Sequence, residues 1–149
     1  MKIGIAADHG GFELKEKLKV QLEKQYLSIS DFGAVAYDAN DDYPDFAIPL
    51  ARAVGAGLVD RGIVLCGSGV GACFTANKVK GVRAALLTET YSAHQGVEHD
   101  DMNMICIGGR VVGEELAWEI VQAFLKAQYS GEARHERRLD KVKQFEKEQ

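Results

Sequence analysis

The chain has 149 residues, 46% hydrophobic and 27% charged, a balance typical of one globular domain with its own core. Its net charge of −4 and isoelectric point near 5.6 give no support to nucleic acid or an anionic membrane as a partner. Three cysteines without a Cys-x-x-Cys pair argue against a disulfide framework or a zinc site and fit a cytoplasmic protein.

Short apolar runs alternate with amphipathic segments from residue 3 onward, and no run is long enough to span a bilayer, so neither a membrane anchor nor a signal peptide is expected. The predicted strands are residues 3–7, 27–32, 62–66, 83–88 and 104–107. The predicted helices are residues 12–25, 43–56, 72–78, 91–98, 114–128 and 134–147, with an exposed polar loop at 34–42.

This alternation predicts an α/β fold and a single domain over residues 1–149. We expect a doubly wound, flavodoxin-like or Rossmann-like, five-stranded parallel sheet with helices on both faces and a C-terminal helix. Ligands of such sheets bind beyond the carboxyl ends of the strands, where the strand order reverses.

A glycine-rich segment, CGSGVG, follows the third predicted strand at residues 66–71. Gly67, Gly69 and Gly71 can adopt positive φ and expose amide N–H groups to a phosphate or an enediolate oxygen, to which Ser68 adds a hydroxyl. A tight strand–helix turn without a ligand would give the same pattern. A dinucleotide fingerprint needs Gly-x-Gly-x-x-Gly, and here the last spacing is one residue short.

Cys66 ends its strand where a parallel sheet opens to ligands, and amide dipoles there favour a thiolate. A free cysteine is more often a small hydrophobic core residue, which is our interpretation of Cys73 and Cys106. Asp8 and His9 end the first strand at the same edge. Because the first and third strands of a doubly wound sheet are neighbours, we expect Asp8, His9 and Cys66 to line one crevice. Asp8 can also cap the following helix.

Basic residues stand further along the chain. His99 either acts in a site or simply ends its helix near the negative dipole end. Arg134 and Arg138 lie one turn apart with His135 beside them, a fork suited to a phosphate group, although such a run is more often a solvated surface. Arg110 follows two glycines and has the same two interpretations.

Taken together, DHGGF, DYPDFA, GIVLCGSGVG, ANKVKGVRAAL, GGRVVG and RHERR resemble the type B ribose-5-phosphate isomerases and the related galactose-6-phosphate isomerases over nearly the whole chain. The resemblance implies an enzyme without metal or cofactor, a homodimer or dimer of dimers. It would interconvert an aldose phosphate and a ketose phosphate, ribose 5-phosphate and ribulose 5-phosphate or a close analogue.

The resemblance also implies roles for single residues. Cys66 is the base that moves a proton between C1 and C2, and Ser68 with the glycine loop holds the enediolate. Asp8 assists proton movement at the sugar oxygens, and His99 opens the ring. Ala72 stands where some relatives carry a glutamate base. The residues implied to bind the phosphate or lie beside it are His9, Tyr43, Arg110, Arg134, His135 and Arg138.

Two departures from the family pattern bear on the substrate. The family reads His-Asn-Asp where this chain has His99, Asp100 and Asp101, and an ionised Asp100 cannot donate to an oxyanion. Residues 131–134 read Gly-Glu-Ala-Arg, one residue longer than the family's Gly-Gly-Arg. If these departures move the arginines that bind the phosphate, the substrate could equally be the phosphate of a tetrose, another pentose or a hexose. A non-catalytic sugar-phosphate-binding protein is a further alternative, and a redox role for Cys66 lacks a nearby resolving cysteine.

His99 follows a helix and precedes a strand, so topology places it at the edge of the sheet opposite Cys66. A two-fold dimer would combine Cys66 of one chain with His99 of the other. A loop long enough to fold His99 back would instead keep both in one chain.

Overall fold

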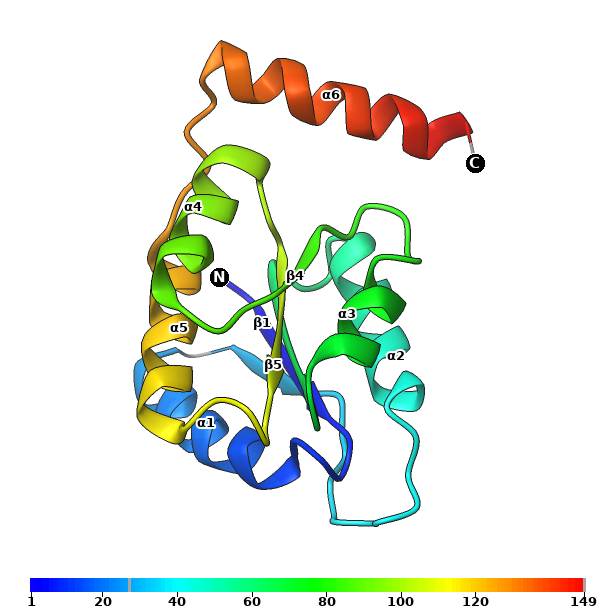
Figure 1. The fold of residues 1–149 in the computed structure, drawn as a ribbon, viewed down its shortest axis with the longest axis vertical. Helices are drawn as coiled ribbons and strands as arrows, with labels where there is room; N and C mark the ends of the chain where they lie inside the picture. Colours follow the sequence, from blue (N-terminus) through cyan, green and yellow to red (C-terminus); the bar gives the residue numbers. More distant parts are fainter. Residues whose placement is uncertain (27, 149) are drawn as a thin grey trace.

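The computed structural model of the chain describes residues 1–26 and 28–148 (Figure 1). Its strands are β1 (Ile3–Ala7), β2 (Ile29–Asp31), β3 (Arg61–Cys66), β4 (Ala84–Leu86) and β5 (Met104–Gly108). Its helices are α1 (Phe12–Gln25), α2 (Pro44–Gly55), α3 (Val70–Ala76), α4 (Thr90–Asp100), α5 (Glu114–Lys126) and α6 (Ala133–Glu148). Within the described residues, no helix is both long and apolar enough to cross a membrane.

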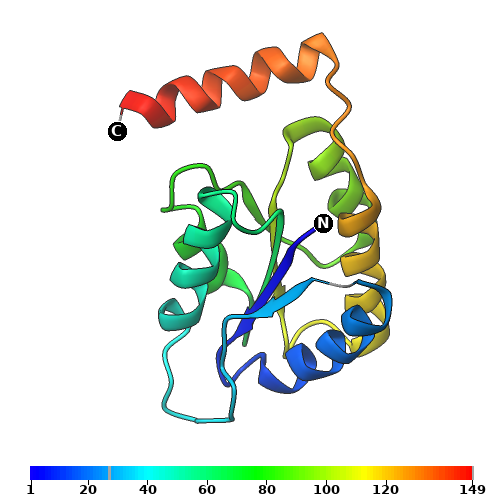
Figure 2. The same cartoon turned by 180° about the vertical axis from the view of Figure 1, so that it is seen from behind.

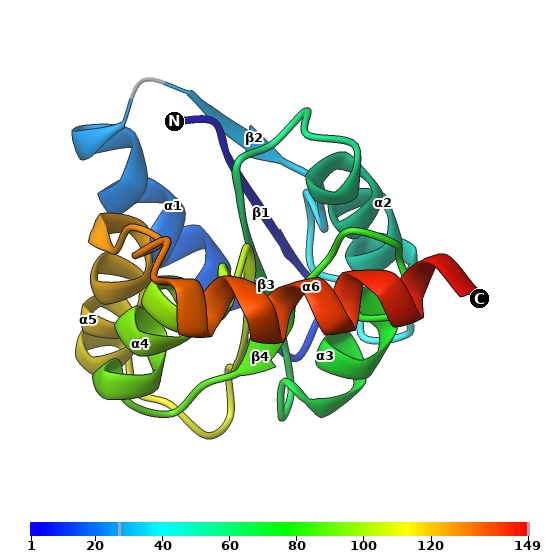
Figure 3. The same ribbon diagram turned by 90° about the horizontal axis from the view of Figure 1, so that it is seen from above.

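All five strands form one parallel sheet in the order β2-β1-β3-β5-β4. Helices α1, α4 and α5 cover one face and α2 and α3 cover the other, as the view from above shows (Figure 3). The predicted doubly wound α/β fold is confirmed. Because β5 lies between β3 and β4, the last two strands are exchanged relative to the flavodoxin order 2-1-3-4-5.

The central strands β1, β3 and β5 are buried on both faces, which explains why they appear in the sequence as continuous apolar runs. The edge strands are shorter than the predicted ranges 27–32 and 83–88, and Leu27 lies outside the described residues. An edge strand has a partner on one side only, so its regular pairing ends where that neighbour diverges.

Two local differences from the sequence-based prediction affect the site. Helix α3 begins at Val70 rather than at residue 72, because Gly69 turns the chain into the helix with a left-handed φ of 82°. The loop between β2 and α2, seen from behind in Figure 2, is exposed at residues 35–40 and at residue 42 as predicted, but two of its residues are not. Ala34 is buried, and Asp41 turns inward with its side chain only 10% exposed.

Helix α6 leaves the body of the domain and crosses the amino ends of the strands, opposite the edge where β1 and β3 end (Figures 1 and 3). Only His135 and Leu139 of this helix are buried. Most of its surface is therefore exposed in the single chain.

A buried ion pair between Lys15 of α1 and Asp31 of β2 links the edge strand to this helix. The Lys15 side chain is fully buried, and its Nζ donates to both carboxylate oxygens of Asp31 at 3.0 and 2.9 Å and to the Ala34 carbonyl at 2.7 Å. Burial raises the pKa of Asp31, but the hydrogen bonds from Lys19, the Gly33 N–H and Lys15 outweigh it, so the pKa is lowered overall. Ionised Asp31 therefore contributes stability above its unfolded pKa, and the contribution is lost as the pH falls through the lower folded pKa.

Asp31→Asn should destabilise the fold strongly, because it removes the more buried of the two carboxylates that pair with the buried Lys15 ammonium. We expect the free energy of unfolding, measured by urea denaturation at pH 7, to fall by about 3–5 kcal/mol. Glu16→Gln removes the other carboxylate that pairs with Lys15. Because the Glu16 side chain is 43% exposed, this variant should lose less than about 1 kcal/mol of unfolding free energy. Equal losses in the two variants would contradict the assigned role of Asp31.

Candidate active site

The carboxyl ends of β1 and β3 are adjacent, since Ala7 pairs with Leu65, and the chain adds strands in opposite directions from this point. A cleft of about 410 Å³ opens there. The residues that line it are Asp8, His9, Gly10, Tyr43, Cys66, Gly67, Ser68, Gly71, Arg110 and Val111. The expected crevice thus contains eight of the fourteen residues predicted to act in the site, and Gly69 supports it from within the loop.

The glycine loop holds Cys66 against a backbone donor. The Cys66 side chain is 4% exposed, and the Gly69 N–H donates to its Sγ at 3.1 Å. Of the three glycines expected to reach positive φ, only Gly69 does so. A Cβ on Gly69 would lie 2.4 Å from Leu86 Cδ1, and one on Gly71 would lie 2.7 Å from the Tyr43 ring. The loop is therefore closely packed on both sides, and its backbone faces the cleft.

Asp8 closes β1 beside this loop. It is 6% exposed, and its Oδ1 accepts the Gly10 N–H at 2.9 Å. Burial raises the pKa of the Asp8 carboxyl, an effect that the Gly10 N–H and His9 oppose. The alternative role of Asp8 as a helix cap is not observed, because α1 has Gly11 at its N-cap position and no side-chain cap.

His9 lines the cleft and is hydrogen bonded to Asp41, which does not line it. Its Nδ1 lies 2.7 Å from Asp41 Oδ1, and its backbone N–H donates to the same oxygen at 2.9 Å. This hydrogen bond is the main reason that the pKa of His9 is raised. Sequence reasoning missed Asp41, because it stands among loop acids that have the pattern of a solvated surface.

Arg110 supplies a second cation to the cleft. Its backbone N–H donates to the Gly67 carbonyl at 3.0 Å, and its guanidinium lies 3.6 Å from the position that a Cβ on Gly67 would take. His9 and Arg110 thus place two basic side chains at the wall of the cleft. An anionic group, such as a phosphate, fits this end of the cleft.

Asp8, His9 and Asp41 bring three possible metal-ligand atoms within 4.8 Å of one another. His9 Nδ1 and Asp41 Oδ1 are hydrogen bonded to each other and not directed at a common centre. We therefore interpret the group as a hydrogen-bonded pair beside Asp8 and not as a metal site.

The remaining predicted residues form a second cluster at the opposite edge of the sheet. His99 stands in the last turn of α4 beside Asp100, and its ring stacks on His135 of α6 with centroids 4.0 Å apart. Gln95 donates to His99 Nδ1 across 2.7 Å. Burial, followed by the proximity of His99 and Arg134, lowers the pKa of His135. Exposed Arg134 and Arg138 lie on the same first turns of α6.

The two clusters do not meet within one chain. Cys66 ends β3 at the carboxyl edge, whereas His99, Asp100, Arg134, His135 and Arg138 lie where α4 and α6 meet at the amino edge (Figure 1). His99 is directly followed by Asp100, the last residue of α4, and β5 begins at Met104. The loop after His99 is therefore short, and it does not carry His99 to the carboxyl edge.

Comparison with known proteins gives matches over almost the full chain. Residues 3–142 match the family described as Ribose/Galactose Isomerase. The solved ribose-5-phosphate isomerase B of Clostridium thermocellum is 46% identical, with a TM-score of 0.94 and 99% of each chain covered. That of Mycoplasma genitalium with bound ribulose-5-phosphate is 44% identical, with a TM-score of 0.94 over 99% of this chain and 97% of the other. The D-erythrulose-4-phosphate isomerase of Pectobacterium atrosepticum is 40% identical over 88% of this chain and 86% of its own length.

Gly69→Ala should destabilise the protein, because the added Cβ meets Leu86 and the residue must keep a φ of 82°. Strain at such a position costs on the order of 1–3 kcal/mol, and the contact adds to it. Gly67→Ala is the matched control, since its Cβ has its nearest neighbour 3.6 Å away and needs no positive φ. Urea denaturation should therefore show a large loss of stability for Gly69→Ala only. Similar stabilities of the two variants would contradict the loop geometry.

Proposed function

The chain belongs to the ribose/galactose isomerase family, and on this basis we propose that it interconverts ribose 5-phosphate and ribulose 5-phosphate through an enediolate. The enzyme class that the sequence indicated, an aldose–ketose isomerase, agrees with this family. The observation that carries the proposal is the Cys66 thiol at the end of β3, against the Gly69 N–H and in one cleft with Asp8, His9 and Arg110.

The reaction needs a base over the substrate carbon and donors for the oxygen that becomes negative. We assign the base to the Cys66 thiolate, which takes the C2 proton of the open-chain aldose and returns it to C1. Loop amides and the Ser68 hydroxyl lie beside it to hold the enediolate. Because burial raises the pKa of Asp8, its carboxyl group is suited to carry a proton between the two sugar oxygens.

The phosphate end of the substrate is assigned to His9 and Arg110. Both line the cleft, and binding energy from this remote group positions the sugar over the base. Tyr43 packs over Gly71 and lines the cleft. Nucleotide binding is not favoured, because the loop lacks the dinucleotide spacing.

The second cluster completes the site when two copies of the chain associate. A two-fold rotation that brings the amino edge of one chain to the carboxyl edge of its partner creates two equivalent sites. Each site then combines the Cys66 cleft of one chain with the His99 cluster of the other. We therefore assign ring opening to His99, and further phosphate contacts to Arg134 and Arg138 with His135 nearby, across a homodimer.

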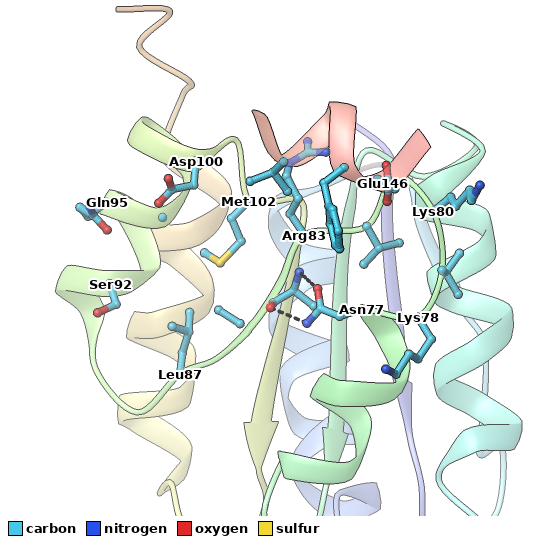
Figure 4. Close-up of a pocket in the computed structure, with 17 residues that line it drawn as sticks. Asn77, Lys78, Lys80, Arg83, Leu87, Ser92, Gln95, Asp100, Met102 and Glu146 are labelled. Atoms are coloured by element: carbon cyan, nitrogen blue, oxygen red, sulfur yellow. Dashed lines mark hydrogen bonds between the residues drawn. The ribbon is translucent and has the colours of Figure 1, made fainter. Parts of the chain in front are cut away.

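Apolar surfaces support this association. A groove of about 820 Å³ is lined by residues of α4, of α6 and of the segment that follows α3 (Figure 4). Its apolar lining residues include Met102, and Val142 and Phe145 of α6. At the other edge α3 exposes Val70 and Phe74, each 54% accessible. We propose that these apolar surfaces are covered in the same dimer, since their burial would stabilise it.

A second candidate substrate class rests on Asp100. This residue follows His99 in the cluster that the proposed dimer brings to the Cys66 cleft, where a carboxylate repels an enediolate that an amide would stabilise. The D-erythrulose-4-phosphate isomerase relative indicates that this fold also serves a four-carbon substrate. Rates of ketose formation from aldose phosphates of four to six carbons decide between ribose 5-phosphate and another sugar phosphate.

Cys66→Ala should lower kcat by at least about 100-fold, because it removes the base, while phosphate binding and the fold are retained. The rate is measured with ribose 5-phosphate, and binding is measured with inorganic phosphate. Cys106→Ala is the control, since Cys106 is fully buried and its loss should cost stability rather than turnover. Turnover near that of the wild type in Cys66→Ala would rule out the assigned base.

Mixing two inactive variants tests the shared site. Cys66→Ala and His99→Ala chains, unfolded together and refolded, should recover roughly a quarter of the wild-type activity, because half of the dimers are mixed and each of these has one intact site. Refolding each variant alone gives the baseline. Mixed dimers confirmed by mass but without recovered activity would mean that Cys66 and His99 act within one chain.

A further inference from the structure

The His9–Asp41 pair is more buried and more fully hydrogen bonded than a histidine needs to be in order to bind phosphate from a surface loop. The Asp41 side chain is only 10% exposed, and it does not line the cleft. Its Oδ1 accepts two hydrogen bonds from His9, at 2.7 and 2.9 Å. Its Oδ2 is buried and has no hydrogen-bond partner among the described residues. A carboxylate desolvated in this way is stabilised by a cation in direct contact, and His9 is the group that its bonded oxygen contacts.

The pairing determines how the His9 ring presents itself to the cleft. A carboxylate only accepts hydrogen bonds, so the proton between the two groups belongs to His9 Nδ1. The nitrogen left for the cleft is Nε2. When the ring is neutral, Nε2 carries a lone pair and repels an anion, and when the ring is protonated it is a charged donor.

The charged groups around His9 come from three segments. Asp8 precedes it on the end of β1, Asp41 faces it from the loop after β2, and Arg110 faces it from the loop after β5. The edge of the Tyr37 ring completes its surroundings, with centroids 6.4 Å apart. The hydrogen bond that His9 donates to Asp41 is the largest of these effects and raises the pKa of His9. Asp8 adds to this increase, and burial and Arg110 oppose it.

We propose that Asp41 is a positioning residue, which orients the His9 ring with Nε2 toward the cleft and keeps it a cationic donor for the phosphate group of the substrate. The phosphate assignment of His9 rests on the proposed function, whereas the charge state of His9 does not. Because the folded pKa is raised, the ring stays charged to higher pH than a free histidine, and phosphate binding extends further into the alkaline range.

The test is Asp41→Asn, which keeps an oxygen acceptor for both His9 hydrogen bonds and removes the charge. His9 should then titrate at lower pH in an NMR titration of the imidazole signals. The affinity for inorganic phosphate, followed at the same signals, should match the wild type at a pH below both His9 titration midpoints. It should be weaker by on the order of tenfold at a pH between the two midpoints. Ionisation of the phosphate itself affects both proteins equally and cancels in the ratio.

Asp38→Asn is the matched control, since Asp38 is exposed in the same loop and, among the described residues, its side chain accepts a hydrogen bond only from the Asn40 N–H, at 2.9 Å. It should leave the His9 titration and the phosphate affinity unchanged. In turnover assays Asp41→Asn should raise KM with increasing pH and change kcat less than about threefold, a split that simple loss of structure would not give.

Two results would overturn the proposal: an unchanged His9 titration in Asp41→Asn, or a ratio of phosphate affinities that does not vary with pH. Failure of the proposed isomerase function has a different signature. In that case the wild type forms no ketose, yet the His9 titration and the phosphate affinities still differ between Asp41→Asn and the wild type.

Discussion

Three loops touch one another through their backbones at the carboxyl edge of the sheet, and the shape of the cleft depends on this contact. A Cβ on Gly10 would lie 2.6 Å from the Gly67 amide nitrogen, and one on Gly109 would lie 2.6 Å from the Gly10 carbonyl oxygen. Gly11 approaches Leu65 of β3 equally closely, at 2.5 Å. Because no side chain fits between them, the loops lie close enough for Asp8, His9, Cys66 and Arg110 to line one cleft, in which the Gly69 N–H donates to the Cys66 sulfur.

The carboxyl edge holds the residues to which proton removal and anion binding are assigned. It lacks the residue assigned to ring opening, His99. That residue lies at the amino edge, where α6 crosses the sheet and stacks His135 on His99. Helix direction in a doubly wound sheet enforces this separation, since α4 must run back before β5 can begin. Association of two chains is thus part of the proposed chemistry, and the exposed apolar side chains of α3 and α6 provide the surface for it.

The sequence allowed the central strands, the helix count and the crevice of Asp8, His9 and Cys66 to be predicted, because buried parallel strands and strand-end residues leave local patterns. The exchange of β4 and β5 could not be predicted, since strand order depends on packing between distant segments. The inward turn of Asp41 was equally hidden, because its loop has the composition of a solvated surface and only the folded chain brings it to His9. The position of His99 at the opposite edge was predictable from topology alone.

The central claim is that Cys66 moves a proton that can exchange with solvent, and isotope labelling tests it most directly. Ribose 5-phosphate is incubated with the protein in deuterated water, and the ketose formed is examined by NMR. The account predicts solvent deuterium at C1 in at least part of the ribulose 5-phosphate made by the wild type, and formation of ketose and label at least about 100-fold slower with Cys66→Ala. Ketose formed without any solvent deuterium would indicate direct hydride transfer, and phosphate binding without ketose or label from any aldose phosphate would indicate a binding protein. Either result would contradict the account.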